Sequence, residues 1–297
     1  MPRSVRCLTL AILLPAACAC STLSSPRRSS PTVTLRFDWP ERLSARVSHT
    51  IATKTPLGDM KVHRGYWLTV GPAEEEGHRR LVPHDIEVSP RMYAGFADPE
   101  PTVFVDDEGG FQGIEPSEEM PGMGLLEALP LDPEKEAQVR ENIVAVLEQA
   151  ALEKWDRLVA RWRGVTLIPG EPVRLETTMV VGTGMLGREE VAAEERTSIE
   201  VGVPCSRGEQ ERRCVRLLVE TEPVGQSKSG TGPMAREQFE LVTDPSTLVP
   251  YSTRLLRVDR VDWGEEGGTQ PLKEFLQMEE YVFTYGAEPA PPGSRSL

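Results

Sequence analysis

The sequence contains few histidines and none of the common catalytic signatures. Its four histidines, His49, His63, His78 and His84, show neither H-x-x-x-H nor H-E-x-x-H spacing, so no metal site is expected. It has no G-x-S-x-G nucleophile elbow, P-loop or dinucleotide fingerprint. These absences favour a non-enzymatic protein without a cofactor and leave no catalytic residue to assign. A hydrolase that lacks a recognisable motif is the alternative.

Basic residues are also in short supply. Lysine and arginine total 33 against 46 acidic residues, which gives a net charge of -13. A balance of this sign repels nucleic acid and anionic lipid headgroups, so no nucleic acid partner is expected. Apolar residues make up 39% of the chain, which is enough to build a folded core.

The N-terminal apolar run is too short to cross a membrane. Residues 7–14 (CLTLAILL) follow Arg3 and Arg6, whereas a spanning helix needs about 20 apolar residues. A basic start, a short apolar run and small residues up to position 19 are typical of a signal peptide. We therefore predict that residues 1–19 are a signal peptide and that the protein is exported.

Two cleavage reactions fit the end of this segment. Ala17-Cys18-Ala19 is an A-x-A site for ordinary cleavage before Cys20. The same stretch resembles the bacterial lipobox, in which an aliphatic residue and two small residues precede the cysteine that receives diacylglycerol. This resemblance implies lipid attachment at Cys20, with Cys18 as the alternative because Pro15 makes its preceding residues the poorer match.

The residues after this cysteine bear on the location of the protein. Residues 20–31 are rich in serine and proline and are typical of a flexible tether. The residue that follows the acylated cysteine is Ser21 or Ala19 and not aspartate, which resembles lipoproteins directed to the outer membrane. We expect a lipid-anchored protein of the cell envelope, on the periplasmic face of the outer membrane. A soluble periplasmic or secreted protein is the alternative.

The mature chain shows mainly strand patterns. Residues 32–39 alternate, with Val33, Leu35, Phe37 and Trp39 on one face, which predicts a half-buried strand. Residues 102–105 and 111–114 flank a glycine-rich turn and predict a hairpin. Further strand patterns precede and follow the middle of the chain, and the alternating residues 280–285 are expected to close the sheet. These patterns predict one β-rich domain over residues 32–286 and a disordered tail over residues 287–297.

One long helix interrupts the strands. Asp132 at the N-cap, Pro133 at the first helical position and Gly164 beyond the end predict a helix over about residues 133–163. Its apolar stripe packs on the sheet or forms a lid over an apolar cavity. In the second case the residues expected to line the cavity are Val139, Ile143, Val146, Trp155, Leu158 and Trp162.

Two cysteines lie in the predicted folded domain. Cys205 and Cys214 flank an eight-residue polar loop, which in an exported protein predicts a disulfide. If the two cysteines were directly opposite, Ile199, Val201 and Val203 would share a face with Arg216 instead of with Val215 and Leu217. A β-bulge or an offset bond is needed to bring the apolar faces together.

The predicted fold class is α+β, with a mostly antiparallel sheet, curved or a half-barrel, and one long amphipathic helix near the middle of the chain. This plan, after an acylated tether, is similar to envelope lipoproteins of the LolA and LppX type, whose curved sheet is closed by helices over a hydrophobic cavity. The resemblance covers architecture only and transfers no functional residue, since the helix here is central whereas that family begins with one. It implies a lipoprotein that binds an apolar ligand or an envelope protein. An apolar cavity without a cluster of titratable groups would favour binding, whereas histidines or carboxylates converging in a cleft would favour a hydrolase.

Overall fold

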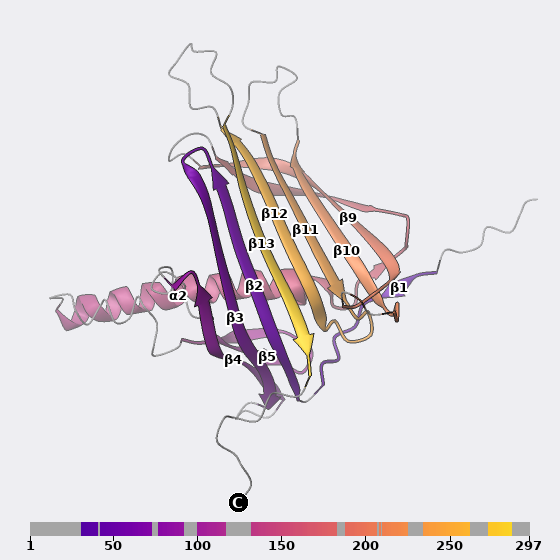
Figure 1. Cartoon of the computed structure of the whole chain (residues 1–297), viewed down its shortest axis with the longest axis horizontal. Coiled ribbons are helices and arrows are strands. Elements are labelled where there is room, and N and C mark those ends of the chain that lie inside the picture. The colour runs from indigo at the N-terminus through magenta and orange to yellow at the C-terminus, as the bar shows by residue number, and fades with distance from the viewer. Residues whose placement is uncertain are drawn as a thin grey trace, which may run out of the picture. The chain divides into compact units, whose positions relative to one another are not determined.

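Eleven strands form one antiparallel sheet, and a single long helix lies against one face of it (Figure 1). The computed structural model describes residues 31–40, 42–72, 77–91, 100–116, 132–182, 188–206, 208, 210–224, 234–261 and 273–286. Residues 31–297 group into one unit. The predicted signal peptide, the tether up to residue 30 and the C-terminal tail lie outside the described residues. The predicted fold class, mostly antiparallel sheet with one long central helix, is confirmed.

The sheet consists of two meanders joined side by side. The first meander contains β2 (Leu43–Thr55), β3 (Gly58–Pro72), β4 (His78–Ser89), β5 (Thr102–Asp106) and β6 (Phe111–Glu115). The second contains β8 (Val173–Gly182), β9 (Arg188–Val203), β10 (Cys214–Pro223), β11 (Met234–Thr243), β12 (Pro250–Val261) and β13 (Lys273–Tyr285). The spatial order is β6-β5-β4-β3-β2-β13-β12-β11-β10-β9-β8. Each strand within a meander therefore pairs with its sequence neighbours.

The last strand joins the two meanders at the middle of the sheet. β13 pairs antiparallel with β12 on one side and with β2 on the other, with Tyr281 opposite His49. The expectation that residues 280–285 close the sheet is therefore wrong, because the two ends of the strand order are β6 and β8. Alternation identifies a strand and its buried face, but it does not identify the neighbouring strands.

The first predicted strand lies outside the large sheet. Only β1 (Val33–Thr34) is paired, with β7 (Thr166–Leu167), in a separate two-stranded ladder. The following backbone is held by hydrogen bonds from Leu35 N to Val165 O and from Asp38 N to Thr247 O. Leu35 and Trp39 are nevertheless buried in the core. The predicted face is therefore correct, whereas a continuous strand over residues 32–39 is wrong, because two different loops supply the hydrogen-bond partners.

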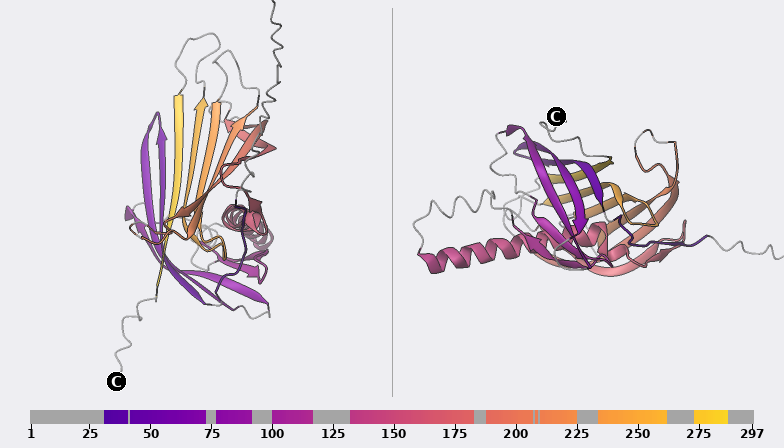
Figure 2. Two further views of the ribbon diagram at one scale, coloured as in Figure 1. Left: turned by 90° about the vertical axis from the view of Figure 1, so that its right-hand side faces the viewer. Right: turned by 90° about the horizontal axis from the view of Figure 1, so that it is seen from below.

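The helix begins as the sequence predicts and ends earlier. α2 (Pro133–Leu158) has Pro133 in its first turn, and the Asp132 side chain accepts a hydrogen bond from Lys135 N. A 3-10 turn, η2 (Ala160–Trp162), follows, and Gly164 has a φ of +71°. Figure 2 shows α2 on the concave side of the curved sheet, with its N-terminal end extending past the strands.

Tryptophans fix the C-terminal half of the helix to the core. The ring centroids of Trp155 and Trp39 are 5.5 Å apart, and Trp155 Nε1 donates to Gly109 O in the turn between β5 and β6. A Cβ at Gly109, which has a φ of +79°, would lie 2.7 Å from the Phe37 ring. The glycine therefore permits close packing of this turn beneath the aromatic residues.

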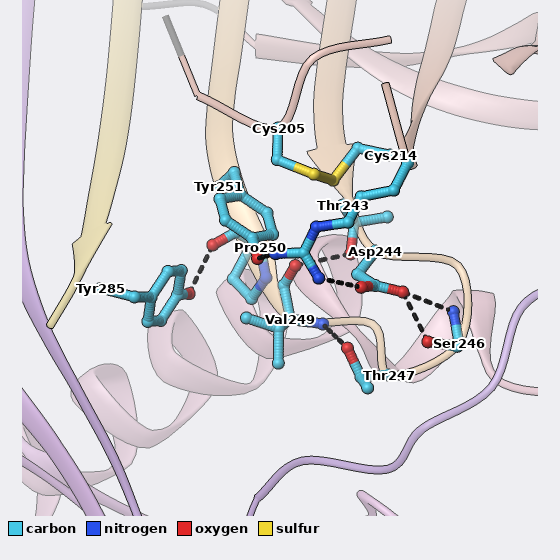
Figure 3. Close-up of a disulfide and its surroundings, with 11 residues drawn as sticks. Cys205, Cys214, Thr243, Asp244, Ser246, Thr247, Val249, Pro250, Tyr251 and Tyr285 are labelled. Atoms are coloured by element: carbon cyan, nitrogen blue, oxygen red, sulfur yellow. Dashed lines mark hydrogen bonds and ion pairs between the residues drawn. A yellow bond between two sulfur atoms is a disulfide. The ribbon is translucent and has the colours of Figure 1, made fainter. Parts of the chain in front are cut away.

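Cys205 and Cys214 form the predicted disulfide, with their Cα atoms 5.1 Å apart (Figure 3). The pairing between β9 and β10 shifts after Cys214, from Cys214 opposite Val203 to Val215 opposite Val201. The extra residue is Gly202, at a φ of +70°. The expected bulge is thus present, and it directs Leu217 and its partner Ile199 to the same buried face.

The disulfide lies beside the turn that connects β11 and β12. Asp244 Oδ1 accepts hydrogen bonds from Ser246 N and Oγ, and Thr247 N donates to Asp244 O. Arg213, next to Cys214, donates to both Asp244 and the Tyr251 hydroxyl. The loop between β9 and β10 is therefore tied to its neighbouring turn (Figure 3).

In the described parts of the chain, no helix is both long enough and apolar enough to span a bilayer.

Candidate ligand-binding cavity

A cavity of about 400 Å³ lies between α2 and the sheet. Its walls come from strands of both meanders, namely β2, β3, β4, β5, β11, β12 and β13, from the segment before β5, and from Trp39. Most of the lining side chains are apolar or aromatic. Since pockets for small ligands measure about 300–1,000 Å³ and are mostly apolar, the cavity suits one small apolar ligand.

The helix contributes its C-terminal half to this wall. Leu147, Ala150, Ala151, Trp155 and Leu158 face the cavity and recur at the three-to-four-residue spacing of one helix face. Trp155 and Leu158 were predicted to line a cavity, and the structure places both there.

The structure places the other four predicted lining residues elsewhere. Val139, Ile143 and Val146 precede the cavity-lining part of the helix, and Val146 is 69% exposed. Trp162 is buried in the main core below the helix end, where its Nε1 donates to Arg157 O. The N-terminal end of α2 extends past the strands of the sheet (Figure 1), and none of Val139, Ile143 and Val146 lines the cavity.

Polar side chains gather at one part of the cavity wall. His49 Nε2 lies 2.9 Å from Glu279 Oε1, and the Tyr281 hydroxyl donates to the same oxygen over 2.7 Å. The His49 and Tyr281 rings stack at 3.9 Å. Lys154 from α2 pairs with Glu100 at 2.7 Å and lies 4.3 Å from the centre of the Tyr281 ring. The five residues form one connected cluster, called the polar cluster below.

The sheet register brings three members of the polar cluster together. Tyr281 is directly opposite His49 in the β13–β2 pair, and Glu279 lies two residues earlier on the same face of β13. Arg64 on β3 is opposite His49 on its other side. The row of cross-strand neighbours therefore runs over three adjacent strands.

The environment of the polar cluster fixes its protonation states. Burial alone would raise the pKa of Glu279, but hydrogen bonds from His49 and Tyr281 outweigh it and lower that pKa to about 2. Burial likewise opposes ionisation of Glu100, yet the charge and hydrogen bond of Lys154 lower its pKa. Burial lowers the pKa of His49 and raises that of Tyr281. At neutral pH both carboxylates are therefore ionised, whereas His49 and Tyr281 are uncharged.

These states determine the tautomer of His49. An ionised Glu279 only accepts hydrogen bonds, so Nε2 of His49 must carry the proton that it donates. In the uncharged ring Nδ1 is then an acceptor, and it has no hydrogen-bond partner among the described residues. The His49 side chain is 2% exposed.

A second buried nitrogen at the cavity also lacks a partner. Trp39 is 4% exposed, and its Nε1 has no acceptor among the described residues. The other tryptophans of this core, Trp155 and Trp162, both donate to backbone carbonyls. Two side chains that line the cavity thus carry a buried donor, Trp39 Nε1, and a buried acceptor, His49 Nδ1, without a hydrogen-bond partner among the described residues.

The sequence analysis did not identify the polar cluster, although the strand pattern contains a signal for it. His49 alternates with Ala45, Val47 and Ile51, and Glu279 alternates with Tyr281 and Phe283. A polar residue within an apolar alternation occupies the buried face. The partners of His49 and Glu279 depend on the pairing of β2 with β13, strands that lie more than 200 residues apart in the sequence.

The structure combines the two features that were expected to separate binding from catalysis. It has an apolar cavity, and it has titratable groups converging on that cavity. The charged groups are paired with one another, however, and no hydroxyl or thiol of the described residues hydrogen bonds to His49 Nδ1. Within the same described ranges, no three histidine, cysteine or acidic side chains are grouped so that they would hold a metal ion.

Comparisons with known proteins leave the family open. No protein-family model matches the sequence, and no curated protein matches it. Among solved structures the chain is similar to lipovitellin, in a structure described as "Lipid-protein interactions in lipovitellin", with a TM-score of 0.44 and 6% identity. The alignment covers 87% of this chain and 27% of that one, so the chain spans about a quarter of its length. A similarity this weak supports no inference about function, and the resemblance to LolA and LppX stays a prediction.

Proposed function

We propose that the protein is a non-enzymatic binding protein of the cell envelope that holds an apolar ligand between α2 and the sheet. The observation that carries this proposal is the cavity of about 400 Å³ with its mostly apolar lining. Transfer of apolar surface from water into such a cavity stabilises a complex by about 25 cal/mol per Å² buried. An envelope protein as the partner is the alternative occupant.

The disulfide supports export. Disulfides persist in oxidising compartments and are rare in the cytosol, and Cys205 and Cys214 are both buried and bonded. The acidic composition gives no indication of nucleic acid binding. Attachment to the outer membrane through a lipid on Cys20, or on Cys18, is the part of the proposal that rests on the signal region alone.

A cavity-filling substitution tests the proposed site. Ala151 lies on the cavity wall, and Ala145 is exposed on the same helix outside the cavity. We expect the neutral fluorescent probe N-phenyl-1-naphthylamine to bind the wild-type protein and Ala145→Trp at one site each. Ala151→Trp should reduce this binding at least about tenfold, because the indole occupies the volume that the probe needs.

The two variants carry the same residue change on the same helix, so a general effect of tryptophan is controlled. Circular dichroism of both variants checks that the fold is kept. Equal probe binding by wild type, Ala145→Trp and Ala151→Trp, or no binding by any of them, would contradict the proposed site.

A hydrolase is the second candidate, favoured by the pair of His49 and Glu279. A carboxylate that holds one ring nitrogen of a histidine leaves the other nitrogen available as a general base. Hydrolysis of p-nitrophenyl decanoate by wild type and His49→Phe distinguishes the two functions. The binding proposal expects no turnover above the uncatalysed rate in either protein, whereas wild-type turnover that is lost in His49→Phe would establish the hydrolase.

A further inference from the structure

The charged side chains around the cavity cancel one another. Three carboxylates line it, Glu100, Glu153 and Glu279, and three cations line it, Arg64, Lys154 and Arg157, so their sum is zero. Three of these charges are already engaged, with Lys154 bonded to Glu100 and Glu279 bonded to His49 and Tyr281. At the polar cluster, an anionic headgroup would have to displace Glu100 from Lys154, and a cationic one would have to displace Lys154 from Glu100. Burying an unpaired charge is unfavourable, so the site disfavours both.

Two buried nitrogens at the cavity that lack a hydrogen-bond partner among the described residues belong to uncharged side chains. Trp39 Nε1 is a donor without an acceptor, and Nδ1 of the neutral His49 is an acceptor without a donor. Both residues line the same cavity and are at most 4% exposed. Buried polar atoms are nearly always satisfied in folded proteins, so we look for the missing partners of these nitrogens in the cavity that both side chains line. A hydroxyl group both accepts and donates, whereas an ether or an ester oxygen only accepts.

We infer that the cavity selects an uncharged amphiphile with a hydroxyl headgroup, which donates to His49 Nδ1 and accepts from Trp39 Nε1, while its apolar chain lies against α2 and the sheet. This inference rests on the proposed function and specifies its ligand class. It distinguishes a fatty alcohol or a hydroxyl-bearing glyceride from a free fatty acid of the same chain length. The paired charges of the polar cluster hold His49 in place and exclude the acid.

Three probes with one common chain test the inference. 1-Decanol, decyl methyl ether and decanoate compete with bound N-phenyl-1-naphthylamine at pH 8, where decanoate is ionised. We expect 1-decanol to displace the probe at a concentration at least about tenfold lower than decanoate, because the charges of the lining side chains already sum to zero and burial of an added carboxylate costs more than burial of a hydroxyl. Equal or tighter binding of decanoate would overturn the inference.

Two variants assign the hydrogen bonds. His49→Phe should weaken 1-decanol about three- to tenfold, the usual worth of one hydrogen bond, and should leave decyl methyl ether unchanged because the ether donates no proton. Trp39→Phe should weaken 1-decanol and the ether alike, because both accept from the indole. A merely structural role of His49 would not separate the alcohol from the ether.

The outcomes separate the inference from the function that it specifies. If the fluorescent probe fails to bind wild type, the proposed cavity function is wrong. If the probe binds normally and the preference for 1-decanol over the ether survives His49→Phe, the function stands and the inference is overturned, since water then satisfies His49. Should His49→Phe fail to fold, Trp39→Phe decides alone: unchanged affinity for both 1-decanol and the ether would overturn the inference.

Discussion

The ionisation of Glu279 depends strongly on the fold. It accepts hydrogen bonds from His49 and Tyr281 at the same oxygen, and the folded protein lowers its pKa from 4.5 to about 2. The shift means that the folded state favours the carboxylate more strongly than the unfolded chain does. This stabilisation is complete above pH 4.5 and is lost as the pH falls through about 2.

The substitution Glu279→Gln makes this dependence measurable. We expect the variant to be less stable than wild type by about 3 kcal/mol at pH 7, as a pKa shift of this size implies. The difference should shrink as the pH falls below 4.5 and should vanish near pH 2, where wild-type Glu279 becomes protonated. Urea unfolding at pH values from 2 to 7 measures it. A difference that stays constant over this range would show that Glu279 acts only through its shape.

For His49, the local sequence indicates burial of the side chain but not the residues that it contacts. Its alternation with Val47 and Ile51 places it on the buried face, as the structure shows with 2% exposure. Its partners, Glu279 and Tyr281, are supplied by a strand more than 200 positions away, and no local pattern specifies that pairing. The alternation therefore contains a signal for a buried histidine, which the sequence analysis did not use, but it contains none for the polar cluster.

Among the elements, α2 is the one that the sequence predicts best. Its N-cap and first turn are set by Asp132 and Pro133, which act through contacts within a few residues. The part of its apolar stripe that meets the sheet depends on where the strands end, which is a tertiary property. For this reason Leu147 and Ala151 line the cavity, while Val146 is on the exposed side.

The β9–β10 hairpin is the element whose stability depends on a covalent link. The disulfide between Cys205 and Cys214 closes a loop of ten residues, which on the chain-entropy model stabilises the fold by about 2.5–3 kcal/mol. We expect the double variant Cys205→Ser/Cys214→Ser to lose about this amount in urea unfolding. Binding of N-phenyl-1-naphthylamine to the folded variant should stay unchanged, because neither cysteine lines the cavity.

Reduction of wild type provides the matched control. Dithiothreitol should lower the stability of wild type by a similar amount and should leave the double variant unaffected. Equal stability of oxidised wild type and the double variant would show that Gly202 and the bulge fix this hairpin without the bond.

For the whole molecule, the local sequence predicts most strands of the sheet but not the long-range pairing between them. Most strands, the β5–β6 hairpin and the bulge at Gly202 follow from local alternation and turn residues. The joining of the two meanders through β13 and β2, and the separate ladder of β1 with β7, depend on long-range pairing. The position of the cavity follows from that pairing, because its walls come from both meanders.

The proposed anchor is a property of the whole exported protein. If Cys20 carries the lipid, Cys20→Ser should move the protein from the membrane fraction to the soluble periplasmic fraction, whereas Cys18→Ser should leave it in the membrane fraction. A single acyl chain binds membranes only weakly, so a stable anchor requires more than one chain. Fractionation with immunodetection measures the shift. Release by Cys18→Ser instead would assign the lipid to Cys18, and no release by either change would contradict the anchor.

Native mass spectrometry of the protein purified from its own cell envelope tests the central claim, an apolar ligand in the cavity, most directly. We predict that wild type and Ala145→Trp each carry a noncovalent mass of one small molecule that organic extraction identifies as a neutral hydroxyl-bearing lipid, and that Ala151→Trp lacks it. Wild-type protein without any such mass, or with the same mass as Ala151→Trp, would contradict the claim.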